Sequence, residues 1–113
     1  MPSTDLALWS ATELLHGFAS RTVSPVEATR AALARIDAHN DRLNAFCLVD
    51  AEGALAAARE SEARWAKGAP KGLVDGVPTS IKDLSLTKGW PTMRGSKAVD
   101  PKGPWDIDAP FVA

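Results

Sequence analysis

The spacing of glycine and proline divides this chain into two parts that can fold in different ways. From position 68 onward these residues recur every few positions, which excludes long helices there. They are Gly68, Pro70, Gly72, Gly76, Pro78, Gly89, Pro91, Gly95, Pro101, Gly103, Pro104 and Pro110. We therefore expect a helical segment at residues 1–67 and a segment of strand and loop at residues 68–113.

Two helix starts in the first segment are marked by capping boxes, in which a serine and a glutamate three residues later cap each other's backbone. Ser10 pairs with Glu13 in the first box, and Ser24 with Glu27 in the second, where proline occupies the first helical position. Apolar residues follow at helical spacing. The expected buried faces are Ala11, Leu14, Leu15 and Phe18 in the first helix, and Val26, Thr29, Leu33 and Ile36 in the second.

The second helix is expected to end at residues 39–41, where the sequence reads His-Asn-Asp. Asp50 can then cap a third, alanine-rich helix that ends near residues 67–68. The first segment is therefore predicted to contain three helices, with a short connection between the second and the third.

Two apolar runs are predicted to be strands. Residues 45–49 are too short for a helix and favour a buried strand. Residues 77–82 favour another, with Pro78 near its beginning because proline donates no hydrogen bond to a sheet. Residues 85–106 are expected to form an extended loop, and a loop of that length is usually functional or belongs to a larger body.

Charge and cysteine content exclude several classes of function. The net charge of -1 gives no electrostatic reason to expect nucleic acid or an anionic membrane as a partner. No run approaches the ~20 apolar residues of a membrane span. Cys47 is the only cysteine, and no signal peptide is recognisable, so we expect a cytoplasmic protein. Two histidines at scattered positions predict no metal site.

The lysine at position 82 is the strongest candidate for chemistry. It ends a short, mostly apolar run, and a lysine is costly to bury unless something requires it. Desolvation would favour its neutral amine, which can take a proton from a hydroxyl. Successive residues of a strand point to opposite faces, so Asp83 is not expected to pair with Lys82. The alternative is an ordinary lysine at the end of a strand, with its ammonium in water.

Residues 76–83 resemble the Gly-(Val/Ile)-Pro-x-x-(Ile/Val)-Lys-Asp motif of the amidase signature family, the serine hydrolases that cleave carboxamides. Other steps of the family pattern follow the same order along the chain, at residues 24–27, 43–46, 91–96 and 108–110. The residues that support the motifs are Gly76, Pro78, Asp83, Thr92, Gly95, Ser96 and Asp108. The resemblance implies an α/β fold with a large mixed sheet covered by helices. Residues 1–113 would be the N-terminal part of that single amidase domain.

The same resemblance implies a Ser–Ser–Lys triad and an acyl-serine intermediate. Lys82 would be the general base, acting on the nucleophile through a bridging serine with a cis peptide bond. No serine of this chain sits in a glycine-rich loop of the family's kind, so the chain alone is expected to be inactive. Met93 and Arg94 would lie near the substrate cleft, where either could contact the acyl group, and the alternative is an exposed pair of loop residues. Ser96 is expected first to shape its loop and second to line the site. No cofactor is implied.

The implied partners are a small-molecule amide substrate and the remainder of the amidase domain. Some members dimerise through their first helices, so the resemblance also admits a homodimer. Two other functions stay open. One is the glutamine-hydrolysing subunit of a tRNA-dependent amidotransferase, which would need partner subunits. The other is a non-enzymatic helical domain that binds a partner through its exposed apolar faces.

Overall fold

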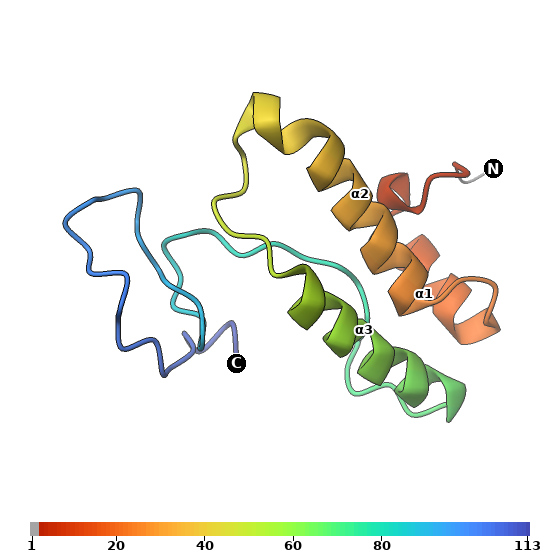
Figure 1. Cartoon of the computed structure of the whole chain (residues 1–113). Coiled ribbons are helices and arrows are strands. Elements are labelled where there is room, and N and C mark those ends of the chain that lie inside the picture. The colour runs from red at the N-terminus through yellow and green to blue at the C-terminus, as the bar shows by residue number, and fades with distance from the viewer. Residues whose placement is uncertain (1–2) are drawn as a thin grey trace. The chain divides into compact units, whose positions relative to one another are not determined.

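The structure is a computed structural model that describes residues 3–113. It divides into two compact units, Met1–Pro78 and Thr79–Ala113. The first unit contains every helix of the described residues (Figure 1). These are the short 3-10 helix η1 at Leu6–Leu8 and the α-helices α1 at Ala11–Ser20, α2 at Pro25–Leu43 and α3 at Ala51–Ala66.

The three α-helices begin where the sequence predicts, whereas the sequence did not predict η1. The Ser10 hydroxyl accepts the Glu13 N–H at 3.2 Å, and the Ser10 N–H donates to the Glu13 carboxylate at 2.7 Å. Ser24 and Glu27 repeat this exchange at 3.1 and 2.8 Å. The Asp50 carboxylate accepts an N–H from the first turn of α3 at 2.9 Å. Both capping boxes and the third cap are therefore confirmed.

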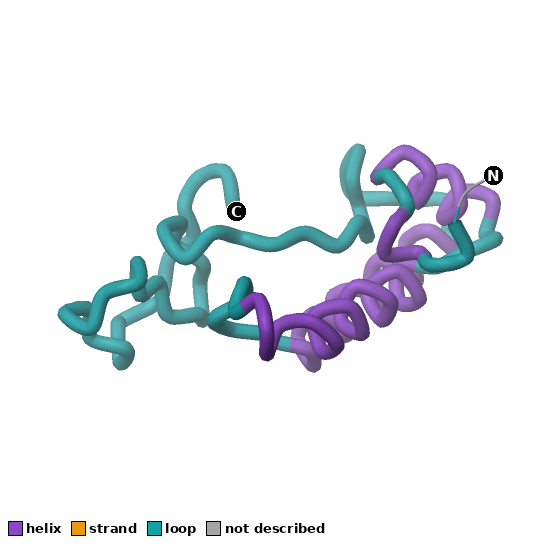
Figure 2. Tube along the Cα trace, turned by 90° about the horizontal axis from the view of Figure 1, so that it is seen from above, coloured by secondary structure: helices purple, strands orange, loops and turns teal. Residues whose placement is uncertain are grey.

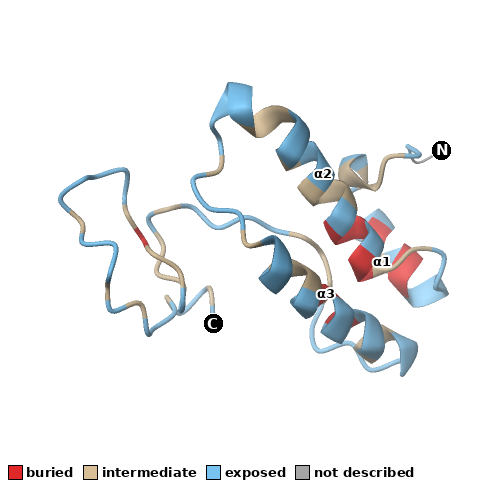
Figure 3. Cartoon of the chain, in the orientation of Figure 1, coloured by how far each residue is buried: buried red, intermediate tan, exposed pale blue. Residues whose placement is uncertain are grey.

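A small hydrophobic core joins the helices of the first unit (Figure 3). Its buried centre consists of Leu14 and Phe18 from α1 and Ala28 from α2. The Phe18 ring lies 6.0 Å from the ring of Trp65, centroid to centroid, at an interplanar angle of 55°. Val77, which follows α3 by eleven residues, packs against the same cluster. This contact fastens the first residues of the lysine-bearing run to the helices.

The predicted end of α2 and the predicted strand at residues 45–49 are both wrong. The helix continues to Leu43 and ends at Asn44, whose φ of 51° is left-handed and whose N–H donates to the Asn40 carbonyl at 2.6 Å. The Asn40 side chain then accepts the Phe46 N–H at 2.9 Å and donates to the Phe46 carbonyl at 3.0 Å. The Asn40 side chain thus satisfies both backbone groups of Phe46, and residues 3–113 contain no strand to pair with the rest of the run, so the segment is a loop held at Phe46.

The predicted strand at residues 77–82 is also wrong, since residues 3–113 contain no strand (Figure 2). A strand requires a neighbour that offers unpaired backbone groups. Here the Val77 N–H donates to the Val74 carbonyl at 3.1 Å within a turn, and Pro78 has no N–H to offer. The described residues thus show the helical part of the expected fold, and the large mixed sheet stays a prediction.

The second unit is a loop held by its own hydrogen bonds. An isolated antiparallel bridge joins Thr87 to Trp90, within the stretch that the sequence predicts as an extended loop. The Gly89 N–H donates to the Trp105 carbonyl at 2.8 Å, and the Ala109 N–H donates to the Leu86 carbonyl at 2.8 Å. These long-range bonds close residues 86–109 into a loop without regular secondary structure.

Candidate active site

The lysine that the sequence marks for chemistry lies in the second unit, near its start. Lys82 is exposed, and its carbonyl accepts the Ser85 N–H at 3.0 Å in a tight turn. The described residues therefore fix the backbone at this position and leave the side chain open to solvent. They do not supply the burial that would favour a neutral amine.

Asp83 connects the lysine turn to the loop at residues 91–96. Its carboxylate accepts the Met93 N–H at 2.8 Å, and its carbonyl accepts the Arg94 N–H at 3.0 Å. The carboxylate and the carbonyl of Asp83 therefore bind two successive N–H groups of the loop. The expectation that Asp83 would not pair with Lys82 was argued from a strand that is absent from residues 3–113, and the carboxylate binds the Met93 N–H instead.

The two residues expected near the substrate cleft lie at a sharp reversal of the chain. Arg94 and the following Gly95 are both left-handed, with φ values of 57° and 65°. The Ser96 N–H donates back to the Met93 carbonyl at 3.0 Å, and the Ser96 hydroxyl accepts the Ala98 N–H at 3.2 Å. The structure thus brings Met93 and Arg94 against the residue that follows Lys82, with Ser96 shaping the loop.

Two further motif residues also hold the backbone of the second unit. The Thr92 side chain is buried, and its hydroxyl lies 3.4 Å from the Ser85 carbonyl, at the limit of a hydrogen bond. The Asp108 carboxylate accepts the Lys88 N–H at 2.6 Å. Both side chains therefore contact backbone groups of the loop that follows the lysine turn.

The first glycine of the lysine motif lies in the first unit and has a packing reason to be glycine. Gly76 has a φ of 88°, a conformation that side chains disfavour. A β-carbon at this position would lie 2.6 Å from the Ser61 hydroxyl of α3 and 2.7 Å from a ring carbon of Pro25 in α2. Only a residue without a side chain lets the segment pass this close to both helices. Pro78 follows at the boundary of the unit.

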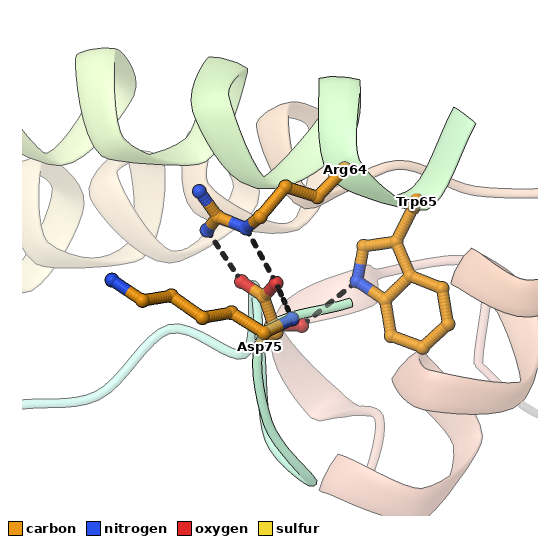
Figure 4. A network of polar contacts seen from close by, with 4 residues as sticks. Arg64, Trp65 and Asp75 are labelled. Atoms are coloured by element: carbon orange, nitrogen blue, oxygen red, sulfur yellow. Dashed lines mark hydrogen bonds and ion pairs between the residues drawn. The ribbon is translucent and has the colours of Figure 1, made fainter. Parts of the chain in front are cut away.

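A buried carboxylate next to Gly76 anchors this segment, and sequence reasoning missed it (Figure 4). Asp75 receives two hydrogen bonds from the Arg64 guanidinium, both at 2.7 Å, and one from the Lys71 N–H at 2.8 Å. The Trp65 indole N–H donates to the Asp75 carbonyl at 3.0 Å. The only sequence signal is an arginine in the last turn of one helix and an aspartate eleven residues later, which is too common to identify a pair.

The charges of this pair stabilise each other. The Arg64 guanidinium and then the Lys71 N–H hold the pKa of the Asp75 carboxyl well below its ordinary value, against the opposing effect of burial. The hydrogen bonds to Asp75 in turn raise the pKa of Arg64. Asp75 is thus an ionised structural residue and not a candidate acid or base.

Residues that could hold a metal do not gather anywhere in the part of the chain that the structure describes. His16 is exposed on α1, and His39 lies half-buried within α2 instead of at its end. Among residues 3–113, no helix is long and apolar enough to cross a membrane.

Comparison with known proteins gives one family. The model of the family described as Amidase matches residues 27–113. A glutamyl-tRNA(Gln) amidotransferase subunit of Salinispora tropica is 49% identical over 104 residues, which cover 91% of this chain and 21% of that protein. The subunit of the same name from Myxococcus xanthus is 45% identical over 100 residues, with 88% and 20% covered. That from Streptomyces coelicolor is 39% identical over 97 residues, with 86% and 20% covered.

The chain therefore spans about a fifth of the length of the curated relatives it matches. No solved structure matches it significantly. The family match includes Lys82, the Asp83 contacts and the loop at residues 91–96, which are the features that the geometry brings together. On this match and on these relatives, the chain belongs to the amidase family.

Proposed function

We propose that this chain supplies the general base of an amide-hydrolysing site, with Lys82 in that role. The observation that carries the proposal is the Lys82–Asp83 step, which lies within the family match. Asp83 joins this step to the loop of Met93 and Arg94 by two hydrogen bonds. The two serines of the triad would come from polypeptide outside the 113 residues. The same polypeptide would bury Lys82, which is exposed in the present structure.

The proposed chemistry has four steps. The neutral Lys82 amine takes a proton from the bridging serine, which takes one from the nucleophilic serine. That serine attacks the carboxamide carbon, and backbone N–H groups stabilise the oxyanion that forms. The bridging serine gives a proton to the leaving nitrogen and regains one from the Lys82 ammonium, so that ammonia or an amine departs and Lys82 is neutral again. Water then hydrolyses the acyl-serine to release the acid.

The names of the relatives favour a second, narrower proposal. The three relatives from Salinispora, Myxococcus and Streptomyces are all named as the same subunit of a glutamyl-tRNA(Gln) amidotransferase. We propose on that ground that glutamine is a substrate to test beside simple amides, with partner subunits present. The family match also favours either enzymatic proposal over a non-enzymatic binding domain.

A chimera tests both proposals. This chain would replace the matched 104-residue segment of the Salinispora tropica relative, and the product would be assembled with that enzyme's partner subunits. Ammonia release would be measured from glutamine, from an aliphatic amide and from an aryl amide. About four-fifths of the chimera comes from the relative, so its preference is compared with that of the unmodified relative. An unchanged preference for glutamine supports the amidotransferase proposal, and a gain of activity with the simple amides supports the broader amidase.

Variants of the chimera test the role of Lys82. We expect Lys82→Met and Lys82→Arg each to lower kcat by about 10²- to 10⁴-fold, because methionine has no base and a guanidinium stays protonated. Lys88→Arg is the matched control, since Lys88 is an exposed lysine of the same unit. A chimera that folds but releases no ammonia, or a Lys82→Met variant with the parent's rate, would refute the proposal.

A further inference from the structure

We infer that Asp83 is a positioning residue, which sets the place at which the Lys82 side chain enters the site. It would do so by tying the loop of Met93 and Arg94 to the backbone that carries the lysine. The inference rests on the proposed function of Lys82 as the base. All the residues it needs lie within Thr79–Ala113, so it depends only on the internal geometry of that unit.

The backbone around the lysine is held on both sides by named hydrogen bonds. The Lys82 carbonyl accepts the Ser85 N–H at 3.0 Å, and the Asp83 carbonyl accepts the Arg94 N–H at 3.0 Å. The Asp83 carboxylate adds the bond to the Met93 N–H at 2.8 Å. A bond from an ionised acceptor to a backbone N–H is among the stronger ones in proteins. Asp83 therefore provides two of the three fixed points.

The loop side of this connection is under local strain. Arg94 adopts a left-handed conformation with a φ of 57°, which is uncommon for a residue with a side chain. Such a conformation persists where the surrounding structure imposes it. The two bonds to Asp83 act on the N–H groups of Met93 and of Arg94 itself, directly at the strained residue. The Asp83 carboxylate and the strained turn at Arg94 are thus directly coupled.

Within the second unit Lys82 is exposed and only its backbone is held, so this unit controls the position of the side chain through the backbone. Its four-carbon stem is flexible, and a displacement of about an ångström at a catalytic group can lower a rate by about 10²-fold. Loss of the Asp83 carboxylate would release the loop and let the lysine turn shift.

The same chimera measures this effect directly. We expect Asp83→Ala to lower kcat by about 10- to 100-fold. Asp83→Asn should restore kcat to within about threefold of the parent, because its amide oxygen can still accept the Met93 N–H. The matched control is Asp100→Ala, which removes a carboxylate that accepts the Lys102 N–H at 2.9 Å in the same unit. That variant should keep the parent's kcat.

Hydrogen exchange of the 113-residue chain provides a second measurement. The Met93 and Arg94 amides should be protected, and Asp83→Ala should remove the protection at Met93 while Asp100→Ala preserves it. An unprotected Met93 amide in the unmodified chain would overturn the inference. An Asp83→Ala chimera that keeps the parent's kcat, measured well below its melting temperature, would also overturn the inference. A merely structural role would lower the melting temperature and leave kcat unchanged. Failure of the proposed function gives a different result, because in that case the Lys82→Met chimera keeps the parent's rate.

Discussion

Replacement of Asp75 by alanine should strongly destabilise the first unit. The Asp75 side chain is only 6% exposed and accepts three hydrogen bonds, two of them from a cation. Removal of one partner from a buried pair costs about 3–5 kcal/mol when the other charge stays buried. Here the Arg64 side chain is 33% exposed, so water can solvate it after the change. We therefore expect a loss of about 2–3 kcal/mol in the free energy of unfolding.

The contribution of Asp75 should depend on pH in a known direction. Its carboxyl has a lower pKa in the folded chain than in the unfolded chain, where the ordinary value near 3.8 applies. The unfolded chain therefore binds the proton first as the pH falls. The stabilisation is complete well above pH 3.8 and declines as the pH falls below that value towards the folded pKa. The stability difference between the parent and Asp75→Ala should shrink over the same range.

Urea titration followed by circular dichroism measures this prediction, because every described helix lies in the unit that contains Asp75. Arg35→Gln serves as the control, since Arg35 and Asp5 form an exposed pair at 3.8 Å, and such pairs add little. A parent and an Asp75→Ala variant with equal midpoints at neutral pH would contradict the reasoning. An unchanged difference between neutral and acidic pH would contradict the assigned ionisation.

Two other substitutions in the first unit should be measurable by the same titration. Gly76→Ala should cost about 2–4 kcal/mol, because it combines a left-handed φ with a β-carbon placed 2.6 Å from the Ser61 hydroxyl and 2.7 Å from Pro25. A neutral result would mean that the segment does not pass between these helices. Ser24→Ala should lower the free energy of unfolding by about 1 kcal/mol, because α2 loses its N-cap. Ser24→Asp should keep most of that stabilisation, because its carboxylate can also cap the helix.

Local signals in the sequence predicted the helix starts, because the chemistry of a cap is contained within four residues. Ser10 with Glu13 and Ser24 with Glu27 needed no distant partner, and both boxes formed as expected. Met93 and Arg94 were expected near the substrate cleft from the family resemblance alone, and that expectation stays a prediction. The bond that places them could not be predicted, since an aspartate next to a lysine has many possible partners.

Strands were over-predicted for a physical reason that the sequence alone does not reveal. The apolar run at residues 45–49 has the composition of a strand, yet the Asn40 side chain satisfies the backbone of Phe46 and leaves no ladder to form. The run at residues 77–82 has no neighbouring strand within residues 3–113. Strand formation depends on a partner strand, whereas helix formation depends on the segment itself. Non-local pairs such as Arg64 with Asp75 were missed on the same ground.

The lysine motif separates residues that hold the fold from the one residue proposed to carry chemistry. Gly76 and Asp83 are fixed by packing and hydrogen bonds, so their substitution should lower stability. Lys82 is exposed, and only its backbone is engaged, so Lys82→Met should leave the unfolding midpoint of the 113-residue chain unchanged. Tryptophan fluorescence, to which Trp90 and Trp105 of the second unit contribute, measures this. A clear loss of stability in Lys82→Met would show that the side chain has a structural partner, and a loss of activity in the chimera could then no longer be assigned to a missing base.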